Sequence, residues 1–139
     1  MSKKIYFFYS AVLFLFMTIS ACSKEDKADN MRDTIVGTWK LTSVSIDGSS
    51  ADISTYPDLI QFQSNSIFQA YNTSTKVKNR GGWSYEGEML NISIYLPAAF
   101  YIKNVDTKNL SLQRYDFNTE GSLKTTIQQY QRTDDSELK

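Results

Sequence analysis

The sequence predicts an all-β domain, an antiparallel up-and-down meander of about eight short strands closed into a β-barrel. Alternating apolar and polar residues recur in short segments that are separated by turn residues. No run of ten or more residues shows the 3.6-residue period of an amphipathic helix. A barrel of about eight strands is either filled by its own side chains or holds one small ligand. The length of 139 residues allows one such domain.

The first strand is expected over residues 36–46. Its apolar residues change face between Leu41 and Val44, so we expect a β-bulge near Thr42-Ser43. Asp47-Gly48 then forms a turn. The strand pattern therefore begins with one long, irregular strand.

A polar segment, residues 49–58, contains Pro57 and is expected to be the longest loop. In a meander barrel such a loop could close one mouth. A further short strand is possible around residues 75–77, and the tail 134–139 is charged and expected to fray. The remaining strands are expected over residues 59–62, 66–71, 83–86, 89–96, 99–105, 110–117 and 122–132.

Glycine and proline residues, and a change in which residues face inward, indicate further irregularities in the predicted strands. Gly81-Gly82 is expected to break the chain before the strand that contains Trp83. Pro97 is expected to end the preceding strand or to restrict it to a sheet edge. Tyr115 and Phe117 are each an odd number of residues from Leu112, so in a regular strand they would face the opposite side from it. We therefore expect a second bulge near Gln113-Arg114.

Residues 1–21 have the pattern of a secretory signal peptide. Lys3 and Lys4 come first, and the uncharged run 5–19 follows. This run is shorter than the roughly 20 residues that span a bilayer as a helix. Because small residues end the run where a cleavage site belongs, a signal peptide is favoured over a retained membrane anchor.

Ile19-Ser20-Ala21-Cys22 resembles the lipobox of bacterial lipoproteins. The resemblance implies cleavage before Cys22 and attachment of lipid, including palmitate, to that residue. Several acyl chains make membrane anchoring stable. Cys22 is the only cysteine, so an intramolecular disulfide is impossible. The alternative is a chance free thiol, which would be a liability in an oxidising compartment.

Ser23-Lys24-Glu25-Asp26 resembles the acidic export signal that directs lipoproteins of some Gram-negative bacteria to the outer face of the outer membrane. The alternative is a solvated, charged linker. Residues 22–34 as a whole are expected to comprise the lipidated cysteine and a flexible tether. The resemblances together imply an outer-membrane protein, anchored through Cys22 and exposed at the cell surface.

Gly37-Thr38-Trp39 followed by Lys40-Leu41 resembles the Gly-x-Trp start of lipocalins, and in particular of small bacterial lipocalin-like lipoprotein domains. The resemblance covers residues 35–133. It implies that Trp39 closes one end of a lipocalin-like β-barrel and that Arg132, on the last strand, packs over it. A guanidinium over an indole stabilises a fold by roughly 0.5–2 kcal/mol. Gly37, Trp39 and Arg132 are thus expected to be structural.

Composition argues against catalysis. The chain has no histidine, which removes the commonest general base and metal ligand, and also the Ser–His and Cys–His arrangements. Asp47, Asp52 and Asp58 could in principle hold calcium, but solvated turn residues explain them better. We therefore expect no catalytic residue, no metal site and no cofactor. Without residues 1–21 the chain carries 13 basic and 15 acidic residues, which gives no reason to expect nucleic-acid binding.

Two functional hypotheses remain open. The first is a lipocalin-like protein that takes a small apolar or amphipathic ligand into the barrel. The second is a surface module that binds a protein or a glycan through exposed aromatic residues and the loop 49–58, around a filled core. Ordinary strand propensity also explains the aromatic content. The candidate ligand-binding residues are Phe62, Phe68, Tyr71, Tyr85, Ile92, Ile94, Phe100 and Leu112.

Overall fold

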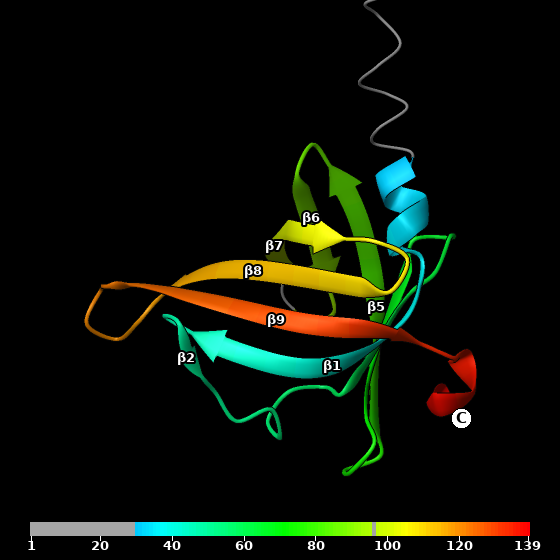
Figure 1. The fold of residues 1–139 in the computed structure, drawn as a ribbon, viewed down its shortest axis with the longest axis horizontal. Coiled ribbons are helices and arrows are strands. Elements are labelled where there is room, and N and C mark those ends of the chain that lie inside the picture. Colours follow the sequence, from blue (N-terminus) through cyan, green and yellow to red (C-terminus); the bar gives the residue numbers. More distant parts are fainter. Residues whose placement is uncertain (1–29, 96) are drawn as a thin grey trace, which may run out of the picture.

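The computed structural model describes residues 30–95 and 97–139. Its strands form a single antiparallel sheet that closes on itself (Figure 1). Residues 30–35 are helical, and a 3₁₀ helix, η1, spans Asp135–Leu138. The strands are β1 Gly37–Ile46, β2 Ser49–Ser50, β3 Leu59–Phe62, β4 Ile67–Asn72, β5 Val77–Glu86, β6 Met89–Ser93, β7 Pro97–Val105, β8 Asn109–Phe117 and β9 Leu123–Thr133.

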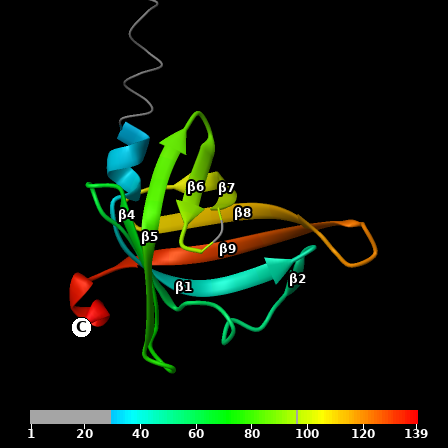
Figure 2. The ribbon, with the colours of Figure 1, turned by 180° about the vertical axis from the view of Figure 1, so that it is seen from behind.

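The pairing order confirms the predicted meander barrel. From β3 to β9 each strand pairs with the next strand in sequence, and β1 pairs with both β3 and β9. The beginning of β1 pairs with β3, whereas nearly its whole length pairs with β9. Eight strands thus close the barrel, and the two-residue β2 adds only to the end of β1. Seen from behind, the β8–β9 hairpin extends beyond the barrel wall (Figure 2).

One of the two predicted bulges is present, and the other lies elsewhere. The register between β1 and β9 shifts between Leu41 and Ser43, as predicted. The β8–β9 pairing is regular throughout, so the bulge expected near Gln113-Arg114 is wrong. Tyr115 alternates normally and lies on the outer face, where it is 47% exposed. The second irregularity is instead in β7, between Ile102 and Asn104.

Gly81-Gly82 does not break the chain, because β5 runs through both glycines. Gly82 pairs with Ile67 of β4 and with Ser93 of β6, so the strand changes partner here. A Cβ atom on Gly81 would lie 1.9 Å from the carbonyl oxygen of Ser93. The glycine therefore permits a close backbone approach within a continuous strand.

Two other strand expectations need correction. Residues 73–76 form the turn between β4 and β5, and only Val77 of the possible strand 75–77 is extended. The strand expected over 89–96 ends at Ser93, and Pro97 opens β7 rather than closing β6. Proline is tolerated at the first residue of a strand, since its missing N–H is not needed there.

The domain includes residues that were expected to be linker or tail. Within the predicted tether, residues 30–34 belong to the helical segment, and Met31 packs against the barrel core. In the predicted frayed tail, Leu138 of η1 is only 8% exposed and packs against Leu59 and Tyr71. Burial of isolated apolar side chains orders both segments, and such single residues leave no periodic signal in the sequence.

Aromatic residues fill the interior beside the helical segment. The Phe62 ring centroid lies 5.1 Å from that of Phe68 and 5.3 Å from that of Trp83. Ile35 and Trp39 are fully buried in the same cluster. One end of the barrel is thus solid, whereas the interior toward the 51–58 loop is not filled. In the part of the chain that the structure describes, the helices are too short or too polar to cross a bilayer.

Candidate functional site

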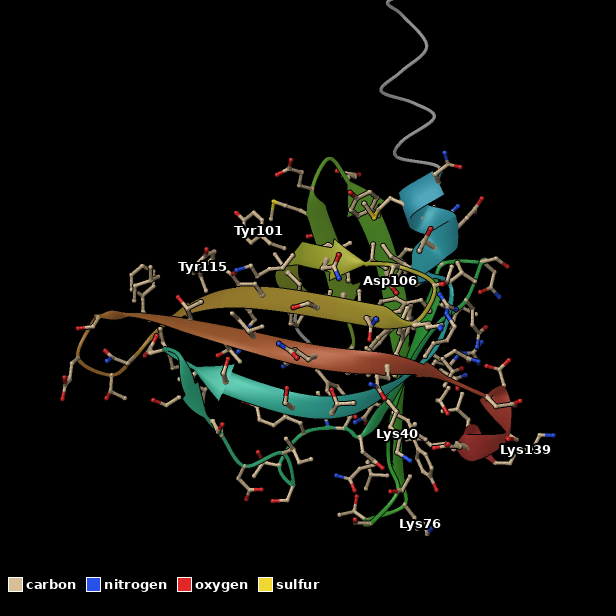
Figure 3. All side chains as sticks on the ribbon, viewed as in Figure 1. Lys40, Lys76, Tyr101, Asp106, Tyr115 and Lys139 are labelled. Carbon is tan, nitrogen blue, oxygen red and sulfur yellow. The ribbon has the colours of Figure 1, made fainter. Side chains whose placement is uncertain are left out.

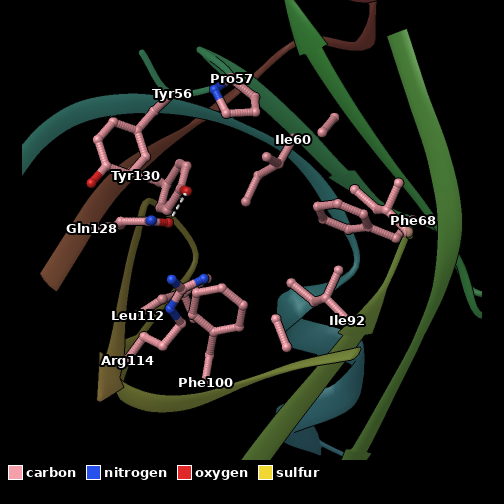
Figure 4. A pocket seen from close by; sticks show the side chains of 13 residues that line it. Tyr56, Pro57, Ile60, Phe68, Ile92, Phe100, Leu112, Arg114, Gln128 and Tyr130 are labelled. Carbon is pink, nitrogen blue, oxygen red and sulfur yellow. Dashed lines mark hydrogen bonds between the residues drawn. The ribbon is translucent and has the colours of Figure 1, made fainter. Parts of the chain in front are cut away.

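A cavity of about 250 Å³ opens from the barrel interior near the 51–58 loop (Figure 4). Six strands and the loop contribute to its wall. The lining residues are Tyr56, Pro57, Ile60, Phe68, Ala70, Ile92, Ile94, Ala98, Phe100, Leu112, Arg114, Gln128 and Tyr130. The volume is slightly below the usual range for ligand pockets, about 300–1,000 Å³. An apolar cavity of about 150 Å³ holds benzene, so this one has room for about ten non-hydrogen atoms.

Most of the wall is apolar because alternate residues of each strand face inward. Ile60 and Phe68 come from β3 and β4, and Ile92 comes from β6. Phe100 and Leu112 complete this surface from β7 and β8. Ala70 and Ala98 also line the cavity, where their short side chains leave more room than longer ones would.

Polar side chains of β8 and β9 form the other part of the wall. The Tyr130 hydroxyl donates a hydrogen bond to Gln128 Oε1 at 2.6 Å. Burial raises the pKa of Tyr130, and the nearby Tyr56 adds to the effect, so this hydroxyl stays protonated and remains a donor. Arg114 Nε donates to Asp116 Oδ2 at 2.7 Å, and Arg114 Cζ lies 5.9 Å from the Phe100 ring centroid.

The loop at the mouth is held in place by its backbone and by one carboxylate. Ala51 N donates to Val44 O at 2.9 Å, and Leu41 N donates to Asp58 O at 2.8 Å. Asp58 accepts hydrogen bonds from the backbone N–H and the hydroxyl of Thr73. Tyr56, between these attachments, is therefore fixed over the cavity. The loop thus lies at one mouth of the barrel, as the sequence suggested.

The three carboxylates considered as calcium ligands each bind a different partner in the structure. Asp47 accepts a hydrogen bond from Thr125 N, and Asp52 bonds with the backbone and hydroxyl of Ser54. Asp58 is bound to Thr73 as described above. Across residues 30–95 and 97–139, no cluster of three or more His, Cys, Asp or Glu side chains could hold a metal ion.

The structure brings together five of the eight candidate ligand-binding residues, namely Phe68, Ile92, Ile94, Phe100 and Leu112. Their role in binding stays a prediction. Phe62 lies deeper, in the solid end of the core. Tyr71 packs with Leu138 outside the barrel, and Tyr85 lies beside the core without reaching the cavity.

Sequence reasoning missed eight lining residues: Tyr56, Pro57, Ile60, Ala70, Ala98, Arg114, Gln128 and Tyr130. Arg114 shares parity with Leu110 and Leu112, so a regular β8 would have placed it inside the barrel. The assumed bulge hid this signal. The polar Gln128 carries no pattern that distinguishes an inward from an outward position, and Tyr56 depends on how the loop folds.

The opposite end of the barrel is closed by Gly37, Trp39 and Arg132. Arg132 Cζ lies 4.2 Å from the Trp39 ring centroid, and the two residues are cross-strand partners. The guanidinium also donates hydrogen bonds to the carbonyl oxygens of Val36, at 2.9 Å, Thr107, at 2.8 Å, and Thr34. The Arg132 side chain on β9 therefore seals this end, because it binds both the segment just before β1 and the β7–β8 turn.

A small aromatic surface lies on the outer face of β7 and β8. The ring centroids of Tyr101 and Tyr115 are 5.6 Å apart in an edge-to-face arrangement (Figure 3). Both side chains are exposed. Trp83 and Tyr71 are buried, whereas Tyr95 and Phe117 are also exposed. The external surface available to a partner is thus smaller than the aromatic content suggests.

The family model of the lipocalin-like domain matches residues 35–124, which is more than half of the chain. The chain belongs to the lipocalin-like domain family. The match begins at Ile35, in the helical segment just before β1. The match ends at Lys124, near the start of β9, so it includes Trp39 but not Arg132.

Several solved structures are similar at low identity. Bovine odorant-binding protein in complex with a selenium-containing odorant is 10% identical, with a TM-score of 0.47, over 77% of this chain and 76% of that chain. The bovine lipocalin allergen Bos d 2 is 11% identical, with a TM-score of 0.49, over 73% and 75%. Aphrodisin, a sex pheromone from female hamster, is 10% identical, with a TM-score of 0.46, over 72% and 76%. No curated protein matches the sequence.

Proposed function

We propose that this protein is a non-catalytic binding protein that takes one small apolar or amphipathic molecule into its barrel. The observation that carries the proposal is the open cavity of about 250 Å³ with a largely apolar wall. A solid barrel would have filled this space with side chains at crystal-like density. The lack of histidine in the sequence supports the non-catalytic assignment.

Titration with 1-octanol, whose size suits the cavity, tests this function. Calorimetry should detect binding with a negative heat-capacity change, the mark of buried apolar surface. Ala98→Leu should reduce the affinity at least tenfold, because the longer side chain enters the cavity. Ala99→Leu is the matched control, since Ala99 is the adjacent residue on the alternate face of β7. Equal binding by the two variants would place the ligand elsewhere. The function would be refuted if the wild type bound neither 1-octanol nor charged octyl ligands of the same chain length.

The proposed setting is the outer membrane, with the barrel anchored through lipid at Cys22 and exposed at the cell surface. The charged start, the uncharged run and Ile19-Ser20-Ala21-Cys22 support it. These residues lie outside those that the structure describes. In a Gram-negative host, labelled palmitate should be incorporated into the wild type and not into Cys22→Ser. Added protease should remove the barrel from intact cells if it faces outward, and should leave it intact if it faces the periplasm.

The alternative function is a surface module that binds a protein or a glycan. The specific observation in its favour is the exposed Tyr101–Tyr115 pair. Replacing both tyrosines by serine should abolish such an interaction and leave octanol binding unchanged. The reverse result, loss of octanol binding with the external pair replaced, would contradict the assignment of the ligand to the barrel interior.

A further inference from the structure

The cavity has two chemically different sides. Ile60, Phe68 and Ile92 form one side, and Arg114 and Gln128 extend into the cavity from the other (Figure 4). A purely apolar ligand would leave the second side without partners. A molecule that fills the cavity is therefore expected to carry an apolar part and a polar head, with the head at β8 and β9.

The polar side offers hydrogen-bond donors. Gln128 Oε1 already accepts from the Tyr130 hydroxyl, so the amide nitrogen of Gln128 is the group that remains for a ligand. Arg114 uses Nε for Asp116, and its two terminal nitrogens remain. A guanidinium has five N–H donors and no acceptor. The head of the ligand should accordingly be an acceptor.

Charge at this position favours an anion. Arg114 and Asp116 form an ion pair, N to O 2.7 Å, and Lys124 lies directly opposite Asp116 in the β8–β9 ladder. Two cations thus accompany one carboxylate. The Arg114 side chain is 42% exposed, so it reaches the solvent at the mouth. An ammonium head would meet the guanidinium at this position and be repelled.

From these observations we infer that the ligand is a small monocarboxylate with an apolar tail. The inference rests on the proposed function and adds the ligand class. The carboxylate binds the terminal nitrogens of Arg114, a geometry in which two parallel hydrogen bonds form, and the Gln128 amide donates to it as well. The tail lies along Ile60, Phe68 and Ile92.

The test compares three ligands of one chain length, octanoate, 1-octanol and octylamine, by calorimetry at neutral pH. The wild type should bind octanoate at least tenfold more tightly than 1-octanol, and octylamine most weakly. Arg114→Met should weaken octanoate binding about tenfold to a hundredfold, the range of a lost hydrogen bond to a charged group. Binding of 1-octanol should change little. The exposed Arg80 gives a matched control, because Arg80→Met removes the same charge away from the cavity.

The double variant Arg114→Met/Asp116→Asn guards against misfolding caused by an unpaired Asp116, and should show the same loss of preference. Equal affinity of the wild type for octanoate and 1-octanol, with no effect of Arg114→Met, would overturn the carboxylate inference and leave the binding function intact. If the folded wild type binds none of the three ligands, the proposed function itself fails, and this inference fails with it.

Discussion

At the residue scale, Arg132 accounts for an unusual requirement at Gly37. The guanidinium lies against Trp39 and donates to the carbonyl oxygen of Val36. Gly37 has a φ of +138°, and a Cβ atom there would lie 2.2 Å from Arg132 Nη1. The glycine in the Gly-x-Trp pattern is therefore needed twice, for its backbone conformation and for the space that the arginine occupies.

Gly37→Ala is expected to lower the free energy of unfolding by about 2–4 kcal/mol, through backbone strain and displacement of Arg132. Urea unfolding followed by tryptophan fluorescence measures it. Gly121→Ala is the control, since Gly121 also has a positive φ, +79°, but a Cβ atom there meets nothing within 4 Å. Gly121→Ala should lower the free energy of unfolding by about 1 kcal/mol. Equal losses in the two variants would show that the arginine contact does not matter.

At the element scale, short segments are held by a few side-chain contacts. The 51–58 loop depends on Asp58, which binds Thr73 in the β4–β5 turn. The C-terminal helix η1 depends on Leu138 and on hydrogen bonds to β1 and β5. Lys40 Nζ lies 3.1 Å from Glu137 Oε2, and Lys78 Nζ donates to the carbonyl oxygen of Leu138 at 2.7 Å. Figure 3 shows Lys40 on the side of the barrel that carries this helix.

Asp58 should make the stability of the domain depend on pH. Partial burial tends to raise the pKa of Asp58, but the hydrogen bonds from Thr73 and the charge of Lys40 outweigh it and hold the pKa below its ordinary value of 3.8. A carboxyl group with a lowered pKa stabilises the fold above the unfolded pKa, and this contribution is lost as the pH falls through the folded pKa.

The wild type should therefore lose stability as the pH drops below 3.8, and Asp58→Asn should show a smaller loss over the same interval. Urea midpoints measured from neutral to strongly acidic pH give the comparison. Asp33→Asn provides the matched control at an exposed position and should keep the wild-type profile. Parallel profiles for the wild type and Asp58→Asn would contradict the role of the Thr73 contact.

The η1 helix should contribute to stability through apolar burial rather than through its ion pair. Leu138→Ala is expected to lower the free energy of unfolding by about 1–2 kcal/mol, because Leu138 covers Leu59 and Tyr71. Glu137→Gln, one residue away, should change stability little, since its pair with Lys40 is exposed to solvent. Thermal or urea unfolding distinguishes the two. A larger effect of Glu137→Gln than of Leu138→Ala would reverse this assignment.

At the scale of the whole molecule, the barrel has one sealed and one open end. The helical residues 30–35 and Arg132 lie where β1 begins and β9 ends, whereas Tyr56 and Pro57 lie at the mouth of the cavity. The chain enters the domain at the sealed end (Figure 1). The first described residues, the helical segment 30–35, thus lie away from the mouth.

If Cys22 carries lipid, the sealed end should face the bilayer. Residues 22–29 span at most about 28 Å when fully extended. A fluorophore at Asp33→Cys should transfer more energy to a headgroup acceptor in vesicles than one at Glu120→Cys, in the β8–β9 turn. When lipid occupies Cys22, the introduced cysteine is the only free thiol, and labelling is specific. Greater transfer from position 120 would show that the mouth faces the membrane instead.

Much of the architecture follows from local patterns. The alternation in β6, the turn at Asp47-Gly48 and the parity change in β1 predict strands, turns and a bulge that the structure contains. These features rest on interactions between near neighbours, which one sequence records directly. The predicted contact between Trp39 and Arg132 follows from the resemblance and not from periodicity.

The cavity illustrates what local patterns do not contain. Five apolar lining residues were predicted because apolar strand residues usually face inward. Tyr71 was predicted with them, but it is three residues from Phe68 and therefore lies on the opposite face of β4, where Leu138 packs against it. Gln128 lies inside because the register of β9 against β8 places it there, and its polarity gives no sign of it.

By itself, the sequence determined the all-β meander and the bulge in β1, because hydrophobic alternation and turn chemistry act over short distances. The contact between Trp39 and Arg132 was expected only from the family resemblance. Only the tertiary structure decided that β5 continues through its glycines, that both flanking segments join the domain, and that Arg114 and Gln128 form a polar wall in an apolar cavity. Those features depend on side chains from distant segments meeting in one place, and the free energy of their packing is a property of the closed barrel rather than of any segment.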